Sequence, residues 1–215
     1  MKNYNISSSY EYNDSSHLPY HFELLPKLND ILSALDDCLT KKKSLFDLGC
    51  GNGSIANYLT NKGWNVTGVD PSDSAIHYAN FNFPKIKLFK GSTSENLASR
   101  FGTFSILISL EVIEHVYDPR EYMTNIFNLL EPGGVAIIST PYHGYLKNLL
   151  ISLIGKMDNH FNVLADRGHI KFWSIKTMNQ LLNEFKFQSI KFSRVGRIHP
   201  LIAKSMIVKF NKPLK

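Results

Sequence analysis

The stretch from residue 44 to residue 70 constrains the fold more than any other part of the chain. A short apolar run, Ser44 to Leu48, ends in a loop with three alternate glycines, Gly49-Cys50-Gly51-Asn52-Gly53. Apolar residues at helical spacing follow, and a second apolar run ends on Asp70. The pattern predicts a strand, a glycine loop, a helix and a second strand, the repeating unit of α/β sheets.

The glycine loop has the chemistry of a nucleoside site. Glycines let the backbone turn sharply and let a ligand approach where a Cβ would clash. Asp70, at the carboxyl end of the second strand, is placed to accept hydrogen bonds from a ribose diol. The spacing is G-x-G-x-G and lacks the third-glycine position of pyrophosphate loops. Asp47, before the first glycine, sits poorly beside phosphates and suits a cationic ligand end such as an ammonium group.

The segment from Asp47 to Gly53, with Asp70 beyond it, resembles the cofactor loop of class I S-adenosylmethionine-dependent methyltransferases. Leu130 to Gly134 matches the Leu-x-Pro-Gly-Gly turn that these enzymes commonly place before their fifth strand. The resemblance implies S-adenosylmethionine as cofactor and S-adenosylhomocysteine as product. It implies cofactor contacts at Asp47, Gly49, Cys50, Gly51, Asp70, Pro71, Ser92 and Leu110.

One position departs from the family pattern. The loop after the third strand commonly carries an acidic residue that meets the adenine amino group, and Ser92 and Thr93 stand there in this chain. The resemblance therefore leaves open how a side chain of this loop recognises adenine.

The rest of the chain alternates strand and helix patterns. Strands are predicted over 86–89, 104–110, 135–140, 188–195 and 201–210, and helices over 21–39, 71–80, 118–130, 146–157 and 174–185. This order predicts a doubly wound, Rossmann-like, seven-stranded and mostly parallel sheet, with an antiparallel edge hairpin and helices on both faces.

The chain length fits a single domain, 1–215. We predict an N-terminal arm and helix over 1–40, a cofactor-binding core over 41–140, a substrate lid over 141–174, and a closing helix and hairpin over 175–215. Tyr12, His17 and Tyr20 of the arm are candidates to touch the cofactor, and a frayed terminus is the alternative.

A charged cluster, Glu111-Val112-Ile113-Glu114-His115, directly follows the fourth strand. If Glu111 begins a helical turn, Glu114 and His115 share its face. Such a set can bind a divalent metal or orient a histidine as a base. The stretch resembles ubiquinone-biosynthesis O-methyltransferases, some of which hold a metal on a Glu/Glu/His set. The same pattern occurs in class I methyltransferases without metal, and we favour the metal-free interpretation.

His169 is the second catalytic candidate beside His115. Gly168-His169-Ile170, with Phe172-Trp173-Ser174, resembles a segment that folds over the substrate in small-molecule methyltransferases. His169 acts there as a base, or it holds the lid to the core, and the sequence leaves the two roles open.

Composition limits the other possibilities. The hydrophobic fraction is 43% and the charged fraction 20%, as in soluble globular proteins. The polar N-terminus lacks the apolar core of a signal peptide. Two cysteines, Cys38 and Cys50, cannot make a disulfide framework, so a reducing cytoplasm is expected. Nothing in the sequence predicts the oligomeric state.

Charge is distributed unevenly along the chain. Residues 131–215 carry 13 Lys and Arg against 4 Asp and Glu, whereas the preceding residues are mildly acidic. A solvated surface explains this, as does an anionic partner. The apolar helix predicted over 146–157 has Lys147 and Lys156 near its ends, which suits a lipophilic or anionic acceptor and peripheral membrane contact. Nucleic acid is disfavoured, because Ser109-Leu110-Glu111 stands where a base-binding Asn-Pro-Pro-Tyr motif would follow the fourth strand.

The predicted function is methyl transfer from S-adenosylmethionine to a small-molecule acceptor. O-methylation is favoured, because histidines and acids are available to take up a proton. A non-catalytic cofactor-binding module is the alternative, which the segment 146–173 disfavours. A nucleotide-binding oxidoreductase is disfavoured by the G-x-G-x-G spacing and by Asp47.

Overall fold

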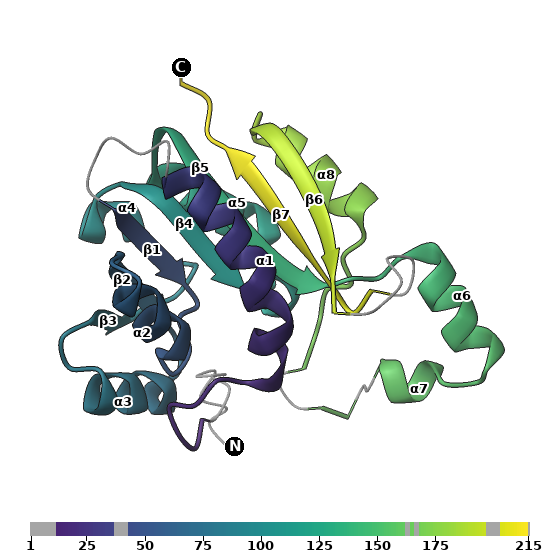
Figure 1. Cartoon of the computed structure of the whole chain (residues 1–215). Helices are drawn as coiled ribbons and strands as arrows, with labels where there is room; N and C mark the ends of the chain where they lie inside the picture. Colours follow the sequence, from purple (N-terminus) through teal and green to yellow (C-terminus); the bar gives the residue numbers. More distant parts are fainter. Residues whose placement is uncertain (1–11, 37–42, 162–163, 166–167, 197–202, 215) are drawn as a thin grey trace, which may run out of the picture.

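The computed structural model describes residues 12–36, 43–161, 164–165, 168–196 and 203–214. Within these residues one sheet has the strand order β3-β2-β1-β4-β5-β7-β6 (Figure 1). Its strands are β1 (Ser44–Leu48), β2 (Asn65–Asp70), β3 (Lys87–Lys90), β4 (Phe104–Leu110), β5 (Leu130–Pro141), β6 (Gln188–Val195) and β7 (Ser205–Asn211).

The sheet is parallel from β3 to β5, and β7 pairs antiparallel with both β5 and β6. This confirms the predicted seven-stranded, mostly parallel sheet with an edge hairpin. Because the parallel strands run the same way, the ends of β1, β2 and β4 meet at one edge. Asp47 and Asp70 are close to that edge, in the last residues of β1 and β2.

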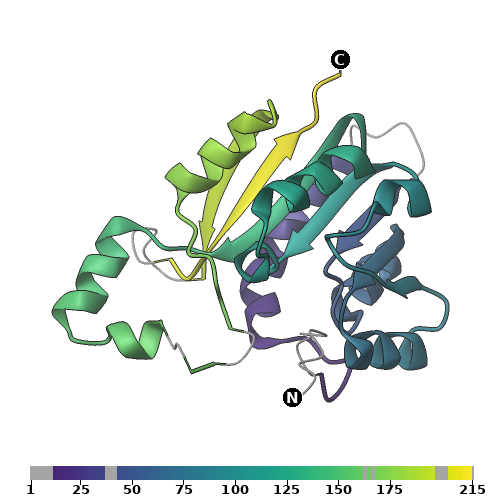
Figure 2. The same cartoon turned by 180° about the vertical axis from the view of Figure 1, so that it is seen from behind.

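Helices cover both faces of the sheet. One face carries α1 (Pro19–Asp36), α2 (Ser54–Asn61) and α3 (Asp73–Asn82), and the other carries α4 (Leu97–Phe101), α5 (Pro119–Leu129) and α8 (Ile175–Glu184) (Figures 1 and 2). Successive side chains of the central strands enter opposite cores: Leu45 packs with the α1 and α2 residues, and Phe46 with those of α5 and α8. Burial on both faces explains why β1 and β4 are nearly continuous apolar runs.

Two predicted helix starts are confirmed by their caps. The Asp118 side chain accepts hydrogen bonds from the backbone N–H groups of Arg120 and Glu121, at 2.9 and 3.1 Å. Ser174 accepts from the Thr177 N–H at 3.2 Å and forms a capping box with it. These caps fix where α5 and α8 begin, immediately after the two loops that carry the catalytic candidates.

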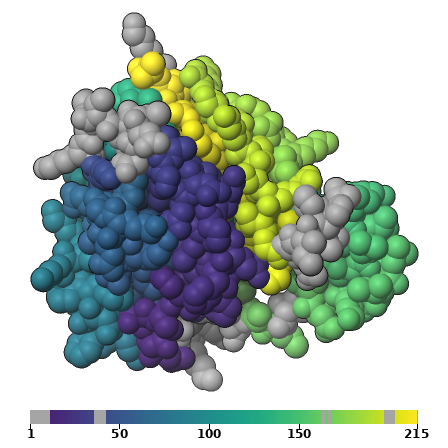
Figure 3. All heavy atoms as spheres, viewed as in Figure 1, coloured from purple at the N-terminus to yellow at the C-terminus, as the bar shows by residue number. Residues whose placement is uncertain are grey.

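The prediction of a single helix over 146–157 is wrong. The segment forms two helices, α6 (Tyr145–Leu153) and α7 (Met157–His160), separated at Gly155, whose φ of 65° favours glycine. No residue of α6 is buried. The two helices form a lobe beside the body of the molecule (Figures 1 and 3).

Other boundaries differ from the predictions by smaller amounts. The Pro-Gly-Gly segment lies inside β5 as an irregularity, because Phe104 pairs with Leu130 and Ile106 with Val135. The five-residue helix α4 was not predicted, since it is too short for a clear period. The strand β7 begins at Ser205, not at residue 201. Some predicted positions lie outside the described residues, namely 1–11, 37–39 and 201–202. Cys38 is among them.

Among the described residues, no helix combines the length and the apolar character needed to cross a membrane.

Candidate ligand-binding and catalytic site

The glycine loop folds back onto the end of β2. The backbone N–H groups of Gly49 and Cys50 both donate to the Val69 carbonyl oxygen, at 2.8 and 3.0 Å. The Gly51 N–H donates to Asp70 Oδ2 at 2.9 Å, and the Ser72 N–H donates to Asp70 Oδ1 at 2.8 Å. The Asp70 carboxylate is therefore held in one orientation, and each oxygen keeps further acceptor capacity for a ligand.

The loop glycines are required by close neighbours and by backbone conformation. A Cβ on Gly49 would lie 2.4 Å from Val112 Cγ2, and one on Gly51 would lie 2.6 Å from the Tyr12 hydroxyl oxygen. Both glycines have positive φ, 86° and 52°. Larger residues cannot replace them without moving the loop.

Asp47 and Asp70 form the acidic floor of this site. Asp47 is 2% exposed, and burial raises the pKa of its carboxyl to about 8, with the Asp70 charge adding to the shift. Asp47 Oδ2 has no hydrogen-bond partner among the described residues. Burial also raises the pKa of Asp70, against its two backbone hydrogen bonds. Two buried carboxylates, one with an unsatisfied oxygen, favour a cationic ligand group.

The Asp47→Asn variant is expected to be more stable than the parent chain at alkaline pH. The ordinary carboxyl pKa is 3.8 and the folded value about 8, so the folded state holds a proton that the unfolded state releases. Below pH 4 the Asp47 carboxyl is protonated in both states and does not lower the free energy of unfolding. As the pH rises toward 8, the free energy of unfolding falls, because only the unfolded state releases the proton. Urea unfolding at pH 5, 6.5 and 8 should show a growing advantage for the variant, reaching a few kcal/mol. Exposed Asp73→Asn is the control, and parallel curves would contradict the burial effect.

The remaining predicted cofactor residues lie along the same sheet edge. Cys50 is a buried free thiol, and burial raises its pKa. Leu110 is buried at the end of β4, and Pro71 follows Asp70 on the surface. The Ser92 N–H donates to Glu95 Oε1 at 2.8 Å, so the loop after β3 is closed by its own carboxylate.

Glu111 does not start a helical turn, so the expectation that Glu111, Glu114 and His115 share one helical face is wrong. Glu111 has a φ of 55°, and the short 3-10 helix η1 spans Ile113–His115. The Glu111 carboxylate instead accepts a hydrogen bond from the Ser139 hydroxyl at 2.9 Å. The Glu111 carboxylate still lies near Glu114, because its charge helps to raise the pKa of the Glu114 carboxyl after burial, the main cause.

The structure groups Glu114 with His115 and His169. One ligand atom from each lies within 4.8 Å of the others. Glu114 is 1% exposed; its Oε2 accepts from the Thr140 hydroxyl at 3.0 Å, and its Oε1 has no partner among the described residues. The two imidazole rings meet edge to face, with centroids 4.9 Å apart. His169 is exposed, and partial desolvation of its ring, followed by the charge of His115, lowers the pKa of His169 to about 4.

The segment 168–173 is tied to η1 through backbone bonds. The N–H groups of Ile170 and Lys171 donate to the Glu114 carbonyl at 2.9 and 3.0 Å. Trp173 Nε1 donates to the Ile113 carbonyl at 3.4 Å, and His115 Nδ1 lies 3.2 Å from the Gly168 carbonyl. A carbonyl oxygen only accepts, so this contact places the His115 proton on Nδ1 and the ring lone pair on Nε2.

Sequence reasoning named Glu114, His115 and His169 but did not bring the three together. It missed Ser139 and Thr140, the hydroxyls that bond Glu111 and Glu114. A signal was present, since these two hydroxyl residues interrupt the apolar run of β5. It also missed Asn52, whose side chain bonds the backbone of the N-terminal segment.

A family model described as a methyltransferase domain matches residues 21–191. Two curated relatives are named ubiquinone biosynthesis O-methyltransferase. That of Rickettsia bellii (strain OSU 85-389) is 43% identical over 100 residues, covering 45% of this chain and 41% of the relative. That of Caulobacter sp. (strain K31) is 36% identical over 115 residues, covering 52% and 45%. The chain thus spans less than half the length of these relatives.

Solved structures show the same fold. The PH0226 protein of Pyrococcus horikoshii OT3 has a TM-score of 0.66 at 20% identity, covering 94% of each chain. Phosphoethanolamine N-methyltransferase 2 of Haemonchus contortus, solved with S-adenosyl-L-methionine, has a TM-score of 0.62 at 15% identity, covering 86% of this chain and 52% of its own.

Proposed function

This chain belongs to the methyltransferase domain family, and on that premise we propose that it transfers a methyl group from S-adenosylmethionine to a hydroxyl group of a small molecule. The observation that carries the proposal is the fixed Asp70 carboxylate beside the glycine loop, with buried Asp47 behind it.

The residues at this edge fit the cofactor. Asp70 would accept the two ribose hydroxyls, as carboxylates after the second strand do in nucleoside-binding sheets. The unsatisfied Oδ2 of Asp47 would take the ammonium of the amino-acid end, which also relieves the repulsion between the two carboxylates. When bound, S-adenosylmethionine supplies an electrophilic methyl group on a sulfonium. The chain must then align the acceptor and accept its proton.

His115 is proposed as the proton acceptor. The Gly168 carbonyl orients its ring and leaves the lone pair on Nε2, the nitrogen that would take the proton of the acceptor hydroxyl. His169 packs against this ring and is proposed to hold the acceptor beside it. The low pKa of His169 keeps its ring neutral at physiological pH. A His115 ring that has accepted a proton is therefore not repelled by a positive charge on His169.

The trio also fits a divalent cation in composition. A carboxylate with two imidazoles is a set that transition metals accept. A cation on Glu114, His115 and His169 would lower the pKa of an acceptor hydroxyl. The proposal retains direct proton transfer, and chelation distinguishes the two modes.

Binding and turnover together test the function. Calorimetric titration with S-adenosylhomocysteine is expected to show one site per chain. Methyl transfer from labelled S-adenosylmethionine to pools of hydroxylated small molecules is expected to give labelled product. A folded chain that binds no S-adenosylhomocysteine would refute the proposal, whereas binding with no transfer to any pool would favour a non-catalytic module.

The acceptor is proposed to be lipophilic. Apolar side chains of α6 face solvent: Leu153 is 73% exposed and Tyr145 78%, and no residue of the helix is buried. Ile170 and Phe172, in the segment that carries His169, are about half exposed as well. Exposed apolar area on this scale marks an interaction surface. Lys156 follows α6, and a lysine beside such a surface suits an anionic headgroup.

The chain is therefore expected to co-sediment with anionic vesicles at low ionic strength and to be released at high salt. Leu153→Asp should weaken this binding several-fold, because it places a charge in the apolar surface. Phe22→Asp is the matched control, since Phe22 is 65% exposed on α1, on the body of the molecule. Equal loss in both variants, or no vesicle binding by the parent chain, would leave α6 without a membrane role.

A further inference from the structure

Residues 12–18 cross the glycine loop as a strap, and one side chain fastens them. Asn52 Nδ2 donates to the carbonyl oxygens of Asp14 and Ser16, both at 2.9 Å. Asn52 Oδ1 accepts from the Ser54 N–H at 3.3 Å, which fixes the amide on the start of α2. Asn52 is 2% exposed, so these bonds are shielded from water and are worth more than surface ones.

The N-terminal end of the strap lies directly over the loop. The Tyr12 N–H donates to Ser74 Oγ at 3.1 Å. The Tyr12 hydroxyl contacts Gly51 so closely that a Cβ there would lie 2.6 Å from its oxygen. The phenol therefore covers the glycine whose N–H binds Asp70.

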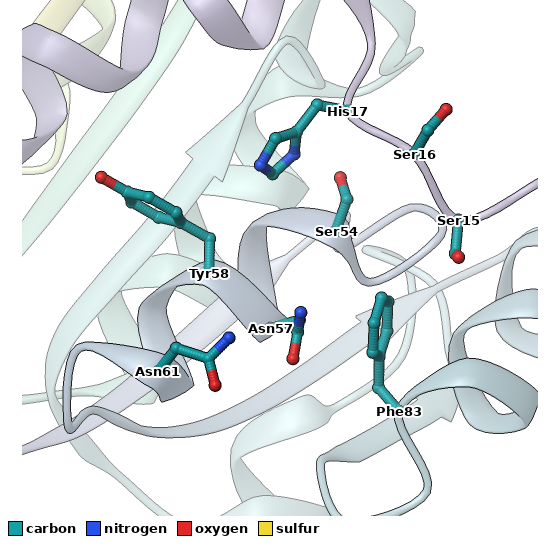
Figure 4. A pocket seen from close by; sticks show the side chains of 8 residues that line it. All are labelled: Ser15, Ser16, His17, Ser54, Asn57, Tyr58, Asn61 and Phe83. Carbon is teal, nitrogen blue, oxygen red and sulfur yellow. The ribbon is translucent and has the colours of Figure 1, made fainter.

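The strap is only partly packed against α2, where the His17 ring meets the Tyr58 ring with centroids 6.1 Å apart. A pocket of about 270 Å³ lies between the strap and α2 (Figure 4). Ser16 and His17 of the strap line it on one side, and Asn57, Tyr58 and Asn61 of α2 line it on the other. Polar side chains line it together with the aromatic rings of Tyr58 and Phe83. A segment that borders an open pocket can open locally, and the Asn52 bonds oppose that opening.

We propose that Asn52 is a positioning residue that clasps the strap over the cofactor site and thereby limits the rate of cofactor exchange. The inference rests on the proposed function, since it takes the loop beside Asp70 as the cofactor site. It assigns Asn52 no contact with the cofactor. Its action is on the strap, and through the strap on entry and exit.

Gating has a kinetic signature that a direct contact lacks. A closed strap slows both entry and exit, because each requires opening. Loss of the clasp must then raise kon and koff together and change Kd much less. Loss of a cofactor contact raises koff and leaves kon nearly constant.

Stopped-flow measurement of S-adenosylhomocysteine binding tests this with two variants of the full chain. Asn52→Asp keeps an acceptor for the Ser54 N–H and removes the NH2 donor, and Asn52→Ala removes both. Each is expected to raise kon and koff by about 10- to 100-fold, as the loss of two shielded hydrogen bonds implies. Asn61→Ala, which removes another amide lining the same pocket, should change neither rate.

Hydrogen exchange of residues 12–18 supplies a readout that needs no cofactor. Both Asn52 variants should exchange faster there, with unchanged protection in β4. An increase in koff alone, unchanged rates, or unchanged exchange in the strap would each overturn the proposal. A parent chain that binds no S-adenosylhomocysteine but loses strap protection on Asn52→Ala would retain the clasp and refute the proposed function instead.

Discussion

Replacing Asp70 by alanine is expected to weaken S-adenosylhomocysteine binding by about 100-fold or more. Each hydrogen bond from a ligand hydroxyl to a carboxylate contributes roughly 1.5–3 kcal/mol, and Asp70 is placed to make two. The variant also leaves the Gly51 and Ser72 N–H groups without their acceptor, so the loop loses its fixed shape. Isothermal titration calorimetry measures the loss directly.

Two further variants test whether the loss of affinity is specific to the Asp70 carboxylate. Asp73→Ala removes a neighbouring carboxylate that is exposed and pairs with Lys90 at 2.7 Å, and it should bind as the parent chain does. Asp70→Asn keeps one acceptor oxygen and should fall between the two. Unchanged affinity in a folded Asp70→Ala chain, judged by its thermal melt, would remove Asp70 from the cofactor site.

Replacing His115 by alanine is expected to lower kcat by about 10²- to 10⁴-fold, the usual contribution of a positioned general base. Affinity for S-adenosylhomocysteine should stay the same, since the ring lies on η1 and not on the glycine loop. The rise of kcat with pH that a base produces should disappear in the variant. His77→Ala on α3 is the control, because that histidine is exposed.

Chelation separates proton transfer from metal chemistry in the same assay. Turnover of the parent chain is expected to persist in excess EDTA, because a histidine base needs no cation. Loss of turnover that Mg²⁺ or Mn²⁺ restores would assign Glu114, His115 and His169 to a cation site. If His115→Ala retains full activity with and without chelator, the ring is structural.

The geometry of the proposed cofactor half of the site could be predicted from sequence because it is local. Asp47, the three glycines and Asp70 lie within one strand–loop–helix–strand unit, and parallel pairing brings the ends of its strands together. Loop spacing alone then places the carboxylates. Ser92 is the exception, since a turn closed by Glu95 depends on side-chain packing that no spacing rule encodes.

The catalytic half could not be assembled from sequence, because its parts are distant in the chain. His115 and His169 are 54 positions apart, and tertiary contacts such as the backbone bonds between segment 168–171 and Glu114 bring them together. Glu111 was misplaced for a different reason. Its positive φ is rare for a glutamate, whereas the helical spacing argument assumes that every residue has the backbone conformation of a right-handed helix.

The lobe of α6 and α7 begins and ends at a single point of the sheet. The His143 N–H, just after β5, donates to the Trp173 carbonyl at 2.9 Å, so the chain leaves and returns across one hydrogen bond. The entropic cost of closing such an inserted segment rises only slowly with the number of its residues. Segments of other lengths and compositions can therefore be exchanged between these two residues while the sheet and the cofactor edge stay unchanged. On the proposed function, exchange of this one segment would change the acceptor while the cofactor edge is kept.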